Sequence, residues 1–413
     1  MSPPRRHVLF VDDEPNVLSG LQRMLRPMRH EYSMHFANGG AEALATLAAG
    51  AFDVVVSDMR MPGIDGAALL DEVSRAHPHI VRIVLSGQAD REAILRVVGP
   101  AHQYLSKPCD ADELKTRLQQ LFALHDLMHN GALRAQIGAL RSLPSTPGLL
   151  NELTDELASD HASLGRIGRI VEQDVALTAK LLQIVSSAFF GVRRSIGSPE
   201  EAVRSLGLDL VRKLMLSPRL VSQIDPTAAT RFRIAGAWRR AVALKRFVKV
   251  IGRLENASEE VTRHAVMAAA LLDTGRLVLA ACIPDEYGAI VDRAALEGTV
   301  LEELERDTLG CTNGEVGAYL LGLWGLPHQV STVLAARHRS GVVGAQSGPT
   351  PLTLVLAAGT IARELLPEAA RDDLAQAERD VPAAISAHCD YETWLRECAA
   401  VDDGEHRRPA CEF

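Results

Sequence analysis

The first 124 residues carry five short apolar segments, each followed by a stretch with helical periodicity. The segments have the length of β-strands, and the stretches between them place apolar residues three and four positions apart, as on one helix face. This alternation predicts an α/β domain with a parallel sheet and helices on both faces. In such sheets, ligands bind beyond the carboxyl ends of the strands. The expected strands are His7–Val11, Tyr32–Phe36, Val54–Asp58, Ile80–Ser86 and Gln103–Ser106.

Length and composition bound the rest of the chain. At 413 residues it is too long for one ordinary core, so we expect about two or three domains. The net charge of −8 argues against a nucleic-acid partner, which normally requires a basic domain. The six cysteines are scattered without a CxxC pair, which is typical of free thiols in a reducing compartment. No signal peptide or membrane-spanning run is recognisable, so we expect a cytoplasmic protein without a membrane partner.

Polar residues stand at the carboxyl ends of four of the expected strands. Asp12 and Asp13 end the first, Asp58 the third and Ser86 the fourth, and Lys107 follows the fifth. Clustered carboxylates repel one another and need a cation, and oxygen ligands favour Mg²⁺. A carboxylate beside Mg²⁺ can accept a phosphoryl group, whose oxygens a lysine and a serine can bind. One such aspartate alone is more typical of a helix cap or a turn, but the whole set favours a phosphoryl-transfer site.

These residues lie in stretches that resemble the response-regulator receiver domain. The resemblance covers residues 6–124, so we place this domain at residues 5–124. It implies a flavodoxin-like fold, a histidine kinase as partner and Mg²⁺ as cofactor. The matching stretches are Leu9–Pro15, Asp58–Gly66, Leu85–Gly87 and Tyr104–Pro108.

The resemblance also implies a role for each residue of the site. Asp58 would be the phosphoacceptor, and Ser86 and Lys107 would bind the phosphoryl group. Tyr104 matches the aromatic switch position, which rotates inward when the serine hydroxyl moves towards the phosphate. The Mg²⁺ ligands would be Asp12, Asp13, Asp58 and the backbone carbonyl of Arg60.

No Pro- or Gly-rich linker follows residue 124. We expect the last helix of the receiver domain to continue to about Leu140, with residues 125–140 as a connecting helix. Its apolar positions form a heptad-like seam, which indicates either packing on its own domain or a dimer or transmission helix. The resemblance adds a surface for a possible homodimer or for output, around Arg91–Val98 and His102–Ser106. The seam residues are Leu114, Leu118, Leu121, His125, Met128, Ala132 and Ala135.

Residues 141–340 show helical patterns and no expected strand, and Val261–Cys282 is expected to be helical with a turn at Gly275. The region has no His-x-x-x-His pair, so a dinuclear metal centre is not expected. Asp273 stands alone and indicates a helix-terminal hydrogen bond, and His338 indicates a solvated or core-edge histidine. Residues 341–413 add helices that could pack on the second domain or cap a dimer.

Four stretches of this region resemble the HDOD domain, a divergent relative of the HD-type phosphohydrolases. Where the parent enzymes have metal-binding histidines, this chain has Leu272-Asp273, Arg240 and Arg337-His338. Two arginines add positive charge where cations should bind. These departures imply a non-catalytic domain without a cofactor, which binds a downstream signalling protein. The stretches are Leu143–Pro147, Leu181–Gly191, Ile196–Gly207 and Gly317–Pro327.

Two functions of different classes remain open. The first is a bacterial two-component response regulator without enzyme activity, in which phosphorylation of Asp58 switches the HDOD domain. The alternative is an HD-type cyclic-dinucleotide phosphodiesterase that retains residual metal binding. DNA binding is disfavoured by the acidic balance, although Arg239-Arg240 with Lys245-Arg246, and Arg193-Arg194, form small basic patches.

Overall fold

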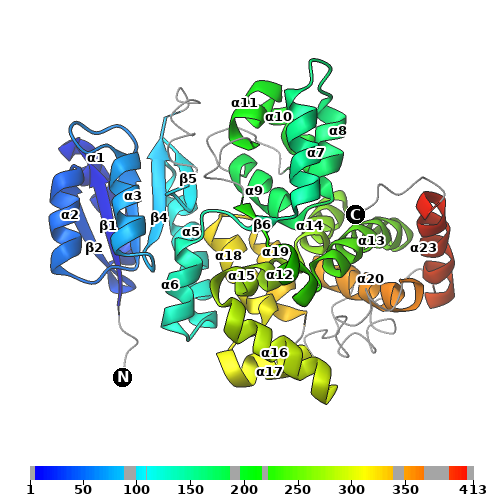
Figure 1. Ribbon diagram of the computed structural model, residues 1–413. Helices are drawn as coiled ribbons and strands as arrows, with labels where there is room; N and C mark the ends of the chain where they lie inside the picture. The colour runs from blue at the N-terminus through cyan, green and yellow to red at the C-terminus, as the bar shows by residue number, and fades with distance from the viewer. Residues whose placement is uncertain are drawn as a thin grey trace.

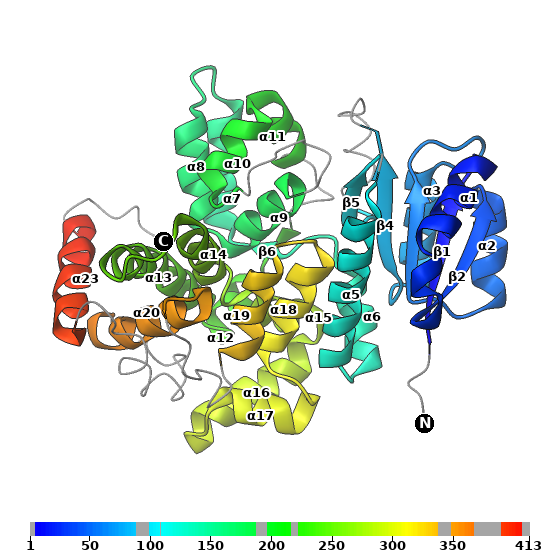
Figure 2. The same cartoon turned by 180° about the vertical axis from the view of Figure 1, so that it is seen from behind.

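The computed structural model describes residues 5–87, 99–107, 109–186, 196–215, 222–337, 348–366 and 390–406. A parallel sheet with its helices lies at one end of the molecule, and a larger, mainly helical region lies at the other (Figure 1). Helices α5 (Ala111–Leu127) and α6 (Gly131–Ala139) stand between the two parts in both views (Figure 1 and Figure 2). This order of an α/β part and a helical part confirms the expected fold class.

The sheet has the five parallel strands that the sequence predicts, in the order β2-β1-β3-β4-β5. The order reverses between β1 and β3, so the switch point lies where these two strands end. The helix expected over residues 91–98 lies outside the described residues. The strands are β1 (Arg6–Asp12), β2 (Tyr32–Asn38), β3 (Val54–Asp58), β4 (Val81–Ser86) and β5 (Gln103–Ser106). The other helices of this part are α1 (Pro15–Met24), η1 (Arg26–His30), α2 (Gly40–Ala49) and α3 (Gly66–Ala76).

Buried strands hold the acidic edge in place. The runs Val8–Val11 in β1 and Val54–Val56 in β3 are at most 2% exposed, as expected for parallel strands covered on both faces. Helix α3 starts just beyond β3, and the Asp65 side chain caps it by accepting a backbone N–H hydrogen bond at 2.9 Å. Gly66 is required there, because a Cβ would lie 2.2 Å from the carbonyl oxygen of Asp58.

The helical region is built around two helices. Helix α13 packs on α14 and α20, and α18 packs on α15 and α19. One short parallel pair of strands, β6 (Pro144–Ser145) with β7 (Ser222–Gln223), was not expected, because two-residue strands leave no periodic pattern. The helices of this region are α7 (Pro147–Ala158), α8 (Leu164–Glu172), α9 (Val175–Val185), α10 (Pro199–Leu206), α11 (Leu208–Met215), α12 (Pro226–Arg231), α13 (Ile234–Leu254), α14 (Glu259–Ala270), α15 (Thr274–Cys282), α16 (Pro284–Glu297), α17 (Leu301–Leu309), α18 (Asn313–Leu323), α19 (His328–Ala336), α20 (Pro351–Leu365) and α23 (Tyr391–His406).

The continuous helix predicted to run to about Leu140 is wrong. Helix α5 ends at Leu127, and three residues separate it from α6. Asn130 caps the new helix, because its side chain accepts the backbone N–H of Leu133 at 3.0 Å. An asparagine side chain that bonds to the backbone in this way starts a helix instead of continuing one.

The heptad-like seam of α5 is buried within this chain. Leu114, Leu118 and Leu121 are at most 2% exposed. They belong to one apolar cluster that extends from the sheet into the helical region. Their burial favours packing of the helix within the chain over a coiled-coil dimer.

The stretch Glu259–Cys282 is apolar and long enough to cross a membrane, and it is the one such stretch among the described residues. It forms part of the core, because 89% of its apolar window is buried. The stretch Val261–Cys282 is helical with a break, as predicted, but the break between α14 and α15 falls at residues 271–273, just before the predicted turn at Gly275. The second helix lies directly on α18, because a Cβ at Gly275 would lie 1.7 Å from the carbonyl oxygen of Asn313.

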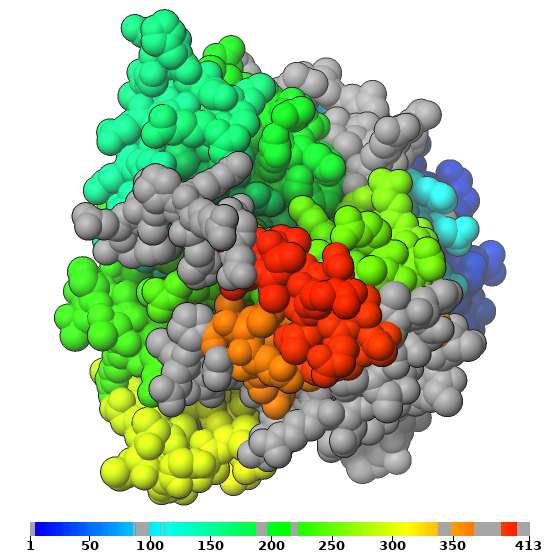
Figure 3. Space-filling model, turned by 90° about the vertical axis from the view of Figure 1, so that its right-hand side faces the viewer, coloured from blue at the N-terminus to red at the C-terminus, as the bar shows by residue number. Residues whose placement is uncertain are grey.

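The C-terminal helices pack on the helical region, which was one of the two predicted alternatives. Helices α20 and α23 both contact α13, and they lie side by side in Figure 3, in orange and red. The indole of Trp394 in α23 is fully buried, and its Nε1–H donates to Glu255 Oε1 at 3.0 Å. Capping of a dimer by these helices stays a prediction.

Candidate functional site

Asp58 is the last residue of β3 and lies at the carboxyl edge of the sheet. It is 8% exposed, so its carboxylate is accessible from one side only. Oδ2 accepts the backbone N–H of Arg60 at 3.0 Å, and Oδ1 forms an ion pair with the Lys107 ammonium. The turn after the strand therefore orients one carboxylate oxygen, and the lysine neutralises the other.

Asp12 lies beside Asp58 and shares the same lysine. Its carboxylate is nearly fully buried, and Oδ2 is 2.8 Å from Lys107 Nζ. The other oxygen, Oδ1, accepts the backbone N–H of Glu14 at 2.9 Å. Burial alone would lower the pKa of Lys107, but the hydrogen bonds and charges of Asp12 and Asp58 outweigh it and raise this pKa. One ammonium group thus holds two carboxylates together.

The donor set of this site fits Mg²⁺. Asp12 and Asp58 offer carboxylate oxygens, and the half-buried Asp13 follows directly after β1. Among the described residues, no group of three or more His, Cys, Asp or Glu side chains has the arrangement of an assembled metal site. In this structure the Lys107 ammonium is paired with both carboxylates. A hard cation must therefore compete with the lysine for these oxygens.

The two remaining residues of the predicted site lie on neighbouring strands. Ser86 ends β4 and is paired in register with Ser106 of β5, but its side chain lies outside the described part of the structure. Tyr104 of β5 is 4% exposed and belongs to an apolar cluster, and its burial raises the pKa of its hydroxyl. The tyrosine at the expected switch position is therefore buried in this structure.

The edge formed by β5 and α5 contacts the helical region directly. The Gln103 side chain donates from Nε2 to the carbonyl oxygen of Gly322 at 2.8 Å. Arg117 of α5 donates from Nη1 to the carbonyl oxygen of Gly325 at 3.2 Å. Sequence reasoning placed a dimerisation or output surface around His102–Ser106 and missed these partners, because more than 200 residues separate each donor from its acceptor.

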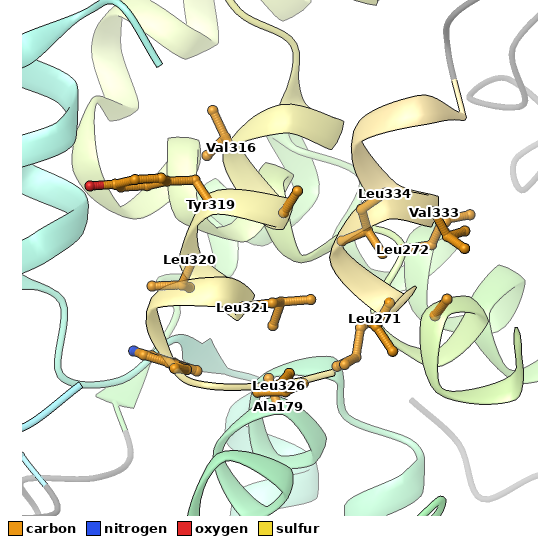
Figure 4. Packing of buried hydrophobic residues seen from close by; sticks show 14 of the residues in the cluster. Ala179, Leu271, Leu272, Val316, Tyr319, Leu320, Leu321, Leu326, Val333 and Leu334 are labelled. Carbon is orange, nitrogen blue, oxygen red and sulfur yellow. The ribbon is translucent and has the colours of Figure 1, made fainter. Parts of the chain in front are cut away.

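The described residues at the positions where the sequence predicts that metal ligands are missing converge in the helical region. Arg240 of α13 donates from Nη2 to Asp273 Oδ1 at 2.8 Å, and the two residues are at most 2% exposed. Arg337 donates from Nη1 to the carbonyl oxygen of Leu272 at 2.9 Å. Leu272 is one of the buried apolar residues around α18 and α19 (Figure 4). His338 lies outside the described residues.

The prediction for Asp273 needs a correction. It lies at the first position before α15, as expected for a helix-terminal residue, but its side chain makes no capping hydrogen bond. It pairs with a buried guanidinium instead, and its second oxygen, Oδ2, has no hydrogen-bond partner. A buried carboxylate is stable only when a nearby positive charge compensates it, and Arg240 supplies that charge.

A polar chain that sequence reasoning missed continues from this pair of arginines. Arg337 Nη2 donates to Asn313 Oδ1 at 2.6 Å. Asn313 Nδ2 donates to Glu305 Oε2 at 2.9 Å, and burial raises the pKa of Glu305 to about 7. A buried asparagine and glutamate without a motif gave no signal in the sequence.

The basic patch predicted around Arg239–Arg246 is only partly on the surface, since Arg239 is exposed and Arg246 half-buried, whereas the other two residues are buried. Arg240 is 1% exposed and Lys245 is 8% exposed. Lys245 Nζ donates to the carbonyl oxygen of Glu172 at 2.9 Å. Arg240 and Lys245 therefore make hydrogen bonds inside the fold and do not contribute to a basic surface. The second patch, Arg193-Arg194, lies outside the described residues.

Two family models match this chain one after the other. A response regulator receiver domain matches residues 8–119, and an HDOD domain matches residues 143–340. The chain therefore contains both of these domains in one polypeptide. It is a receiver domain fused to an HDOD domain, as its motifs predict.

Curated relatives match a part of the chain. It is 35% identical over 161 residues to the hydrogenase transcriptional regulatory protein HoxA of Cupriavidus necator, which is 38% of this chain and 32% of that protein. It is 33% identical over 159 residues to the transcriptional regulatory protein ZraR of Salmonella typhimurium, which is 37% of this chain and 35% of that protein. The chain thus spans about a third of the length of these relatives.

Among solved structures, the MmoQ response regulator of Methylococcus capsulatus str. Bath has a similar fold. The similarity covers 62% of this chain and 98% of that one, with a TM-score of 0.50 and 23% sequence identity. At this level of identity the likeness concerns the fold.

Proposed function

We propose that Asp58 accepts a phosphoryl group from a histidine kinase in the bacterial cytoplasm, and that this switches the HDOD domain. The observation that carries the proposal is the shared lysine. Lys107 pairs with both Asp12 and Asp58 at the carboxyl edge of the sheet, where the order of strands reverses. A carboxylate nucleophile, a second carboxylate and a lysine in one crevice are groups that Mg²⁺-dependent phosphoryl transfer uses.

Transfer of the phosphoryl group to Asp58 forms one bond to phosphorus and breaks another. An Asp58 oxygen attacks the phosphorus of the phosphohistidine, the P–N bond breaks, and the departing imidazole nitrogen takes up a proton. Mg²⁺ would be held by Asp12, Asp13, Asp58 and the Arg60 carbonyl, and it supplies positive charge for the phosphoryl oxygens. The Arg60 N–H keeps Oδ2 of Asp58 oriented, and Lys107 moves from the carboxylates to a phosphoryl oxygen. Ser86 would donate a hydrogen bond to another oxygen.

We propose that the HDOD domain is not catalytic and acts by binding a signalling protein. Two guanidinium groups support this, because Arg240 already neutralises Asp273 and Arg337 binds the Leu272 carbonyl. A metal ion at this place would have to enter beside two buried positive charges, which costs electrostatic energy. Leu272 offers no ligand atom besides its backbone carbonyl, which already accepts this hydrogen bond.

The phosphoacceptor role is tested with acetyl phosphate and Mg²⁺ as a small-molecule donor. Intact-mass spectrometry should show one phosphoryl adduct on the wild type and none on Asp58→Asn. Asp112→Asn is the matched control, since this aspartate is exposed at the start of α5 and should leave the adduct unchanged. An adduct that survives Asp58→Asn would sink the assignment.

The non-catalytic role is tested by metal analysis of the full chain after purification without chelators. We expect less than stoichiometric iron, manganese and zinc. Stoichiometric metal that disappears in Asp273→Asn would instead support the alternative, a cyclic-dinucleotide phosphodiesterase.

A further inference from the structure

The C-terminal end of α18 carries a notch that the receiver domain fills. A Cβ at Gly322 would lie 1.9 Å from Cδ1 of Leu124, so the leucine of α5 rests directly on the glycine backbone. The ring of His125, the next residue of α5, lies 6.1 Å from the ring of Tyr319. The Tyr319 side chain points towards α5 in Figure 4. The absence of a side chain at Gly322 therefore creates a seat for one large apolar residue.

The same end of α18 offers backbone acceptors. The last carbonyls of a helix have no partner within the helix, and they form the negative end of its dipole. Here Gln103 donates to the carbonyl of Gly322, and Arg117 donates to the carbonyl of Gly325. Gly325 has a φ of 74°, which turns the chain away from α18 directly after the helix. The seat thus selects for hydrogen-bond donors and a positive charge.

We infer that this seat, formed by Tyr319, Gly322 and Gly325, is the docking site for a partner protein, and that α5 occupies it in cis. The inference rests on the proposed function, because it names the surface that the receiver covers and releases. The occupant is an amphipathic helix that offers hydrogen-bond donors to these carbonyls. This helix has a leucine that takes the position of Leu124 and an arginine that takes the position of Arg117. The two residues are seven positions apart, so they lie on one helix face.

The position of Gln103 links the seat to the phosphoacceptor site. Gln103 is the first residue of β5, Tyr104 follows it, and Lys107 comes directly after the strand. Gln103 holds α18 while Lys107 holds Asp58, so both ends of a four-residue strand are engaged. Displacement of β5 when Asp58 is phosphorylated would loosen the contact with Gly322 and free the seat.

The experiment measures binding of a fluorescein-labelled peptide of residues 110–128 to the full chain by fluorescence anisotropy. Leu124→Asp should open the seat, because it places a charge against α18. Ala123→Asp is the matched control, since Ala123 is the exposed neighbour on the same helix. We expect the peptide to bind Leu124→Asp on the order of tenfold more tightly than wild type or Ala123→Asp, because the cis competitor is removed.

Two further variants keep the test decisive. Gln103→Ala combined with Arg117→Ala removes the two polar contacts and leaves Leu124 in place, and it should also increase peptide binding. Gly322→Leu added to this double variant fills the seat and should abolish binding. A peptide with Arg117→Glu should bind more weakly to every opened chain.

Equal peptide binding to wild type, Leu124→Asp and the double variant would overturn the inference. The variants are tested without phosphorylation, so this result would not bear on whether Asp58 is the phosphoacceptor. Failure to label Asp58 would overturn the proposed function and leave the peptide result standing.

Discussion

Gln103 Nε2 lies 2.8 Å from the carbonyl oxygen of Gly322, which joins the last strand of the receiver sheet to a central helix of the HDOD domain. The neighbouring residue, Tyr104, is the buried tyrosine at the expected switch position. The receiver edge that would change on phosphorylation is therefore already in contact with the output domain.

Gly322→Ala should destabilise the chain. The added methyl group would lie 1.9 Å from Leu124 Cδ1, so either the leucine or the helix must move. Overpacking of this kind costs about 1–3 kcal/mol in unfolding free energy, to be measured by urea denaturation. The control is Gly148→Ala, where a Cβ would meet nothing within 4 Å. Equal stability of the two variants would contradict the tight seat.

Lys107→Ala should bind Mg²⁺ more tightly. Without the ammonium, Asp12 and Asp58 lose the cation that now pairs with both. We expect a decrease in the dissociation constant on the order of tenfold, or about 1.4 kcal/mol, by isothermal titration calorimetry. Lys115→Ala, a substitution on α5, should leave the affinity unchanged. Weaker binding by Lys107→Ala would show that the lysine does not compete with the metal.

Arg240→Met should destabilise the chain strongly. The substitution leaves the carboxylate of Asp273 buried without its charged partner. Loss of one partner of a buried pair costs about 3–5 kcal/mol. Arg239→Met, at the exposed neighbouring residue, should cost less than about 0.5 kcal/mol. The double variant Arg240→Met with Asp273→Leu should recover much of the loss, and additive effects in this cycle would disprove the coupling.

Lys180 should make stability depend on pH. Its Nζ donates to the Arg141 carbonyl at 2.6 Å and lies 5.0 Å from the centre of the Trp324 ring. Burial, and then the charge of Arg141, lower the pKa of Lys180 to about 7. Because the folded pKa lies below the unfolded value, this group's contribution is present in full above the unfolded pKa and is lost as pH falls towards about 7.

The measurement is the unfolding free energy of wild type and Lys180→Met at pH 7 and pH 9.5. The substitution also changes the packing around this side chain, but that effect is the same at both pH values and cancels. Wild type should gain stability relative to the variant as pH rises, by at most about 1.4 kcal/mol per pH unit. A difference that stays constant with pH would contradict the lowered pKa.

The sheet could be predicted from sequence because each strand is a short apolar run. Val54–Val56 is buried on both faces, and that burial is visible in the sequence itself. The place of Asp58 and Lys107 followed, since parallel strands bring their carboxyl ends to one edge. Local pattern was sufficient here.

Contacts between distant segments could not be predicted in this way. The leucines of α5 have the same spacing whether they face a second copy of the chain or α18. The spacing therefore could not distinguish a dimer helix from packing within the chain. The spacing of apolar residues predicted one helix to about Leu140, but the side chain of Asn130 caps the start of a new helix there. The pairing of Arg240 with Asp273 needed the fold, because a departure from a motif shows which ligand is lost and not what replaces it.

The central claim is that the state of Asp58 controls the contact between β5 and α18. Hydrogen–deuterium exchange tests it, with beryllofluoride as a stand-in for the phosphoryl group, in the presence of Mg²⁺. We predict faster exchange in segments 111–127 and 313–325 of the wild type, and no change in Asp58→Asn. Unchanged exchange in both segments of a wild type that binds beryllofluoride would contradict the account.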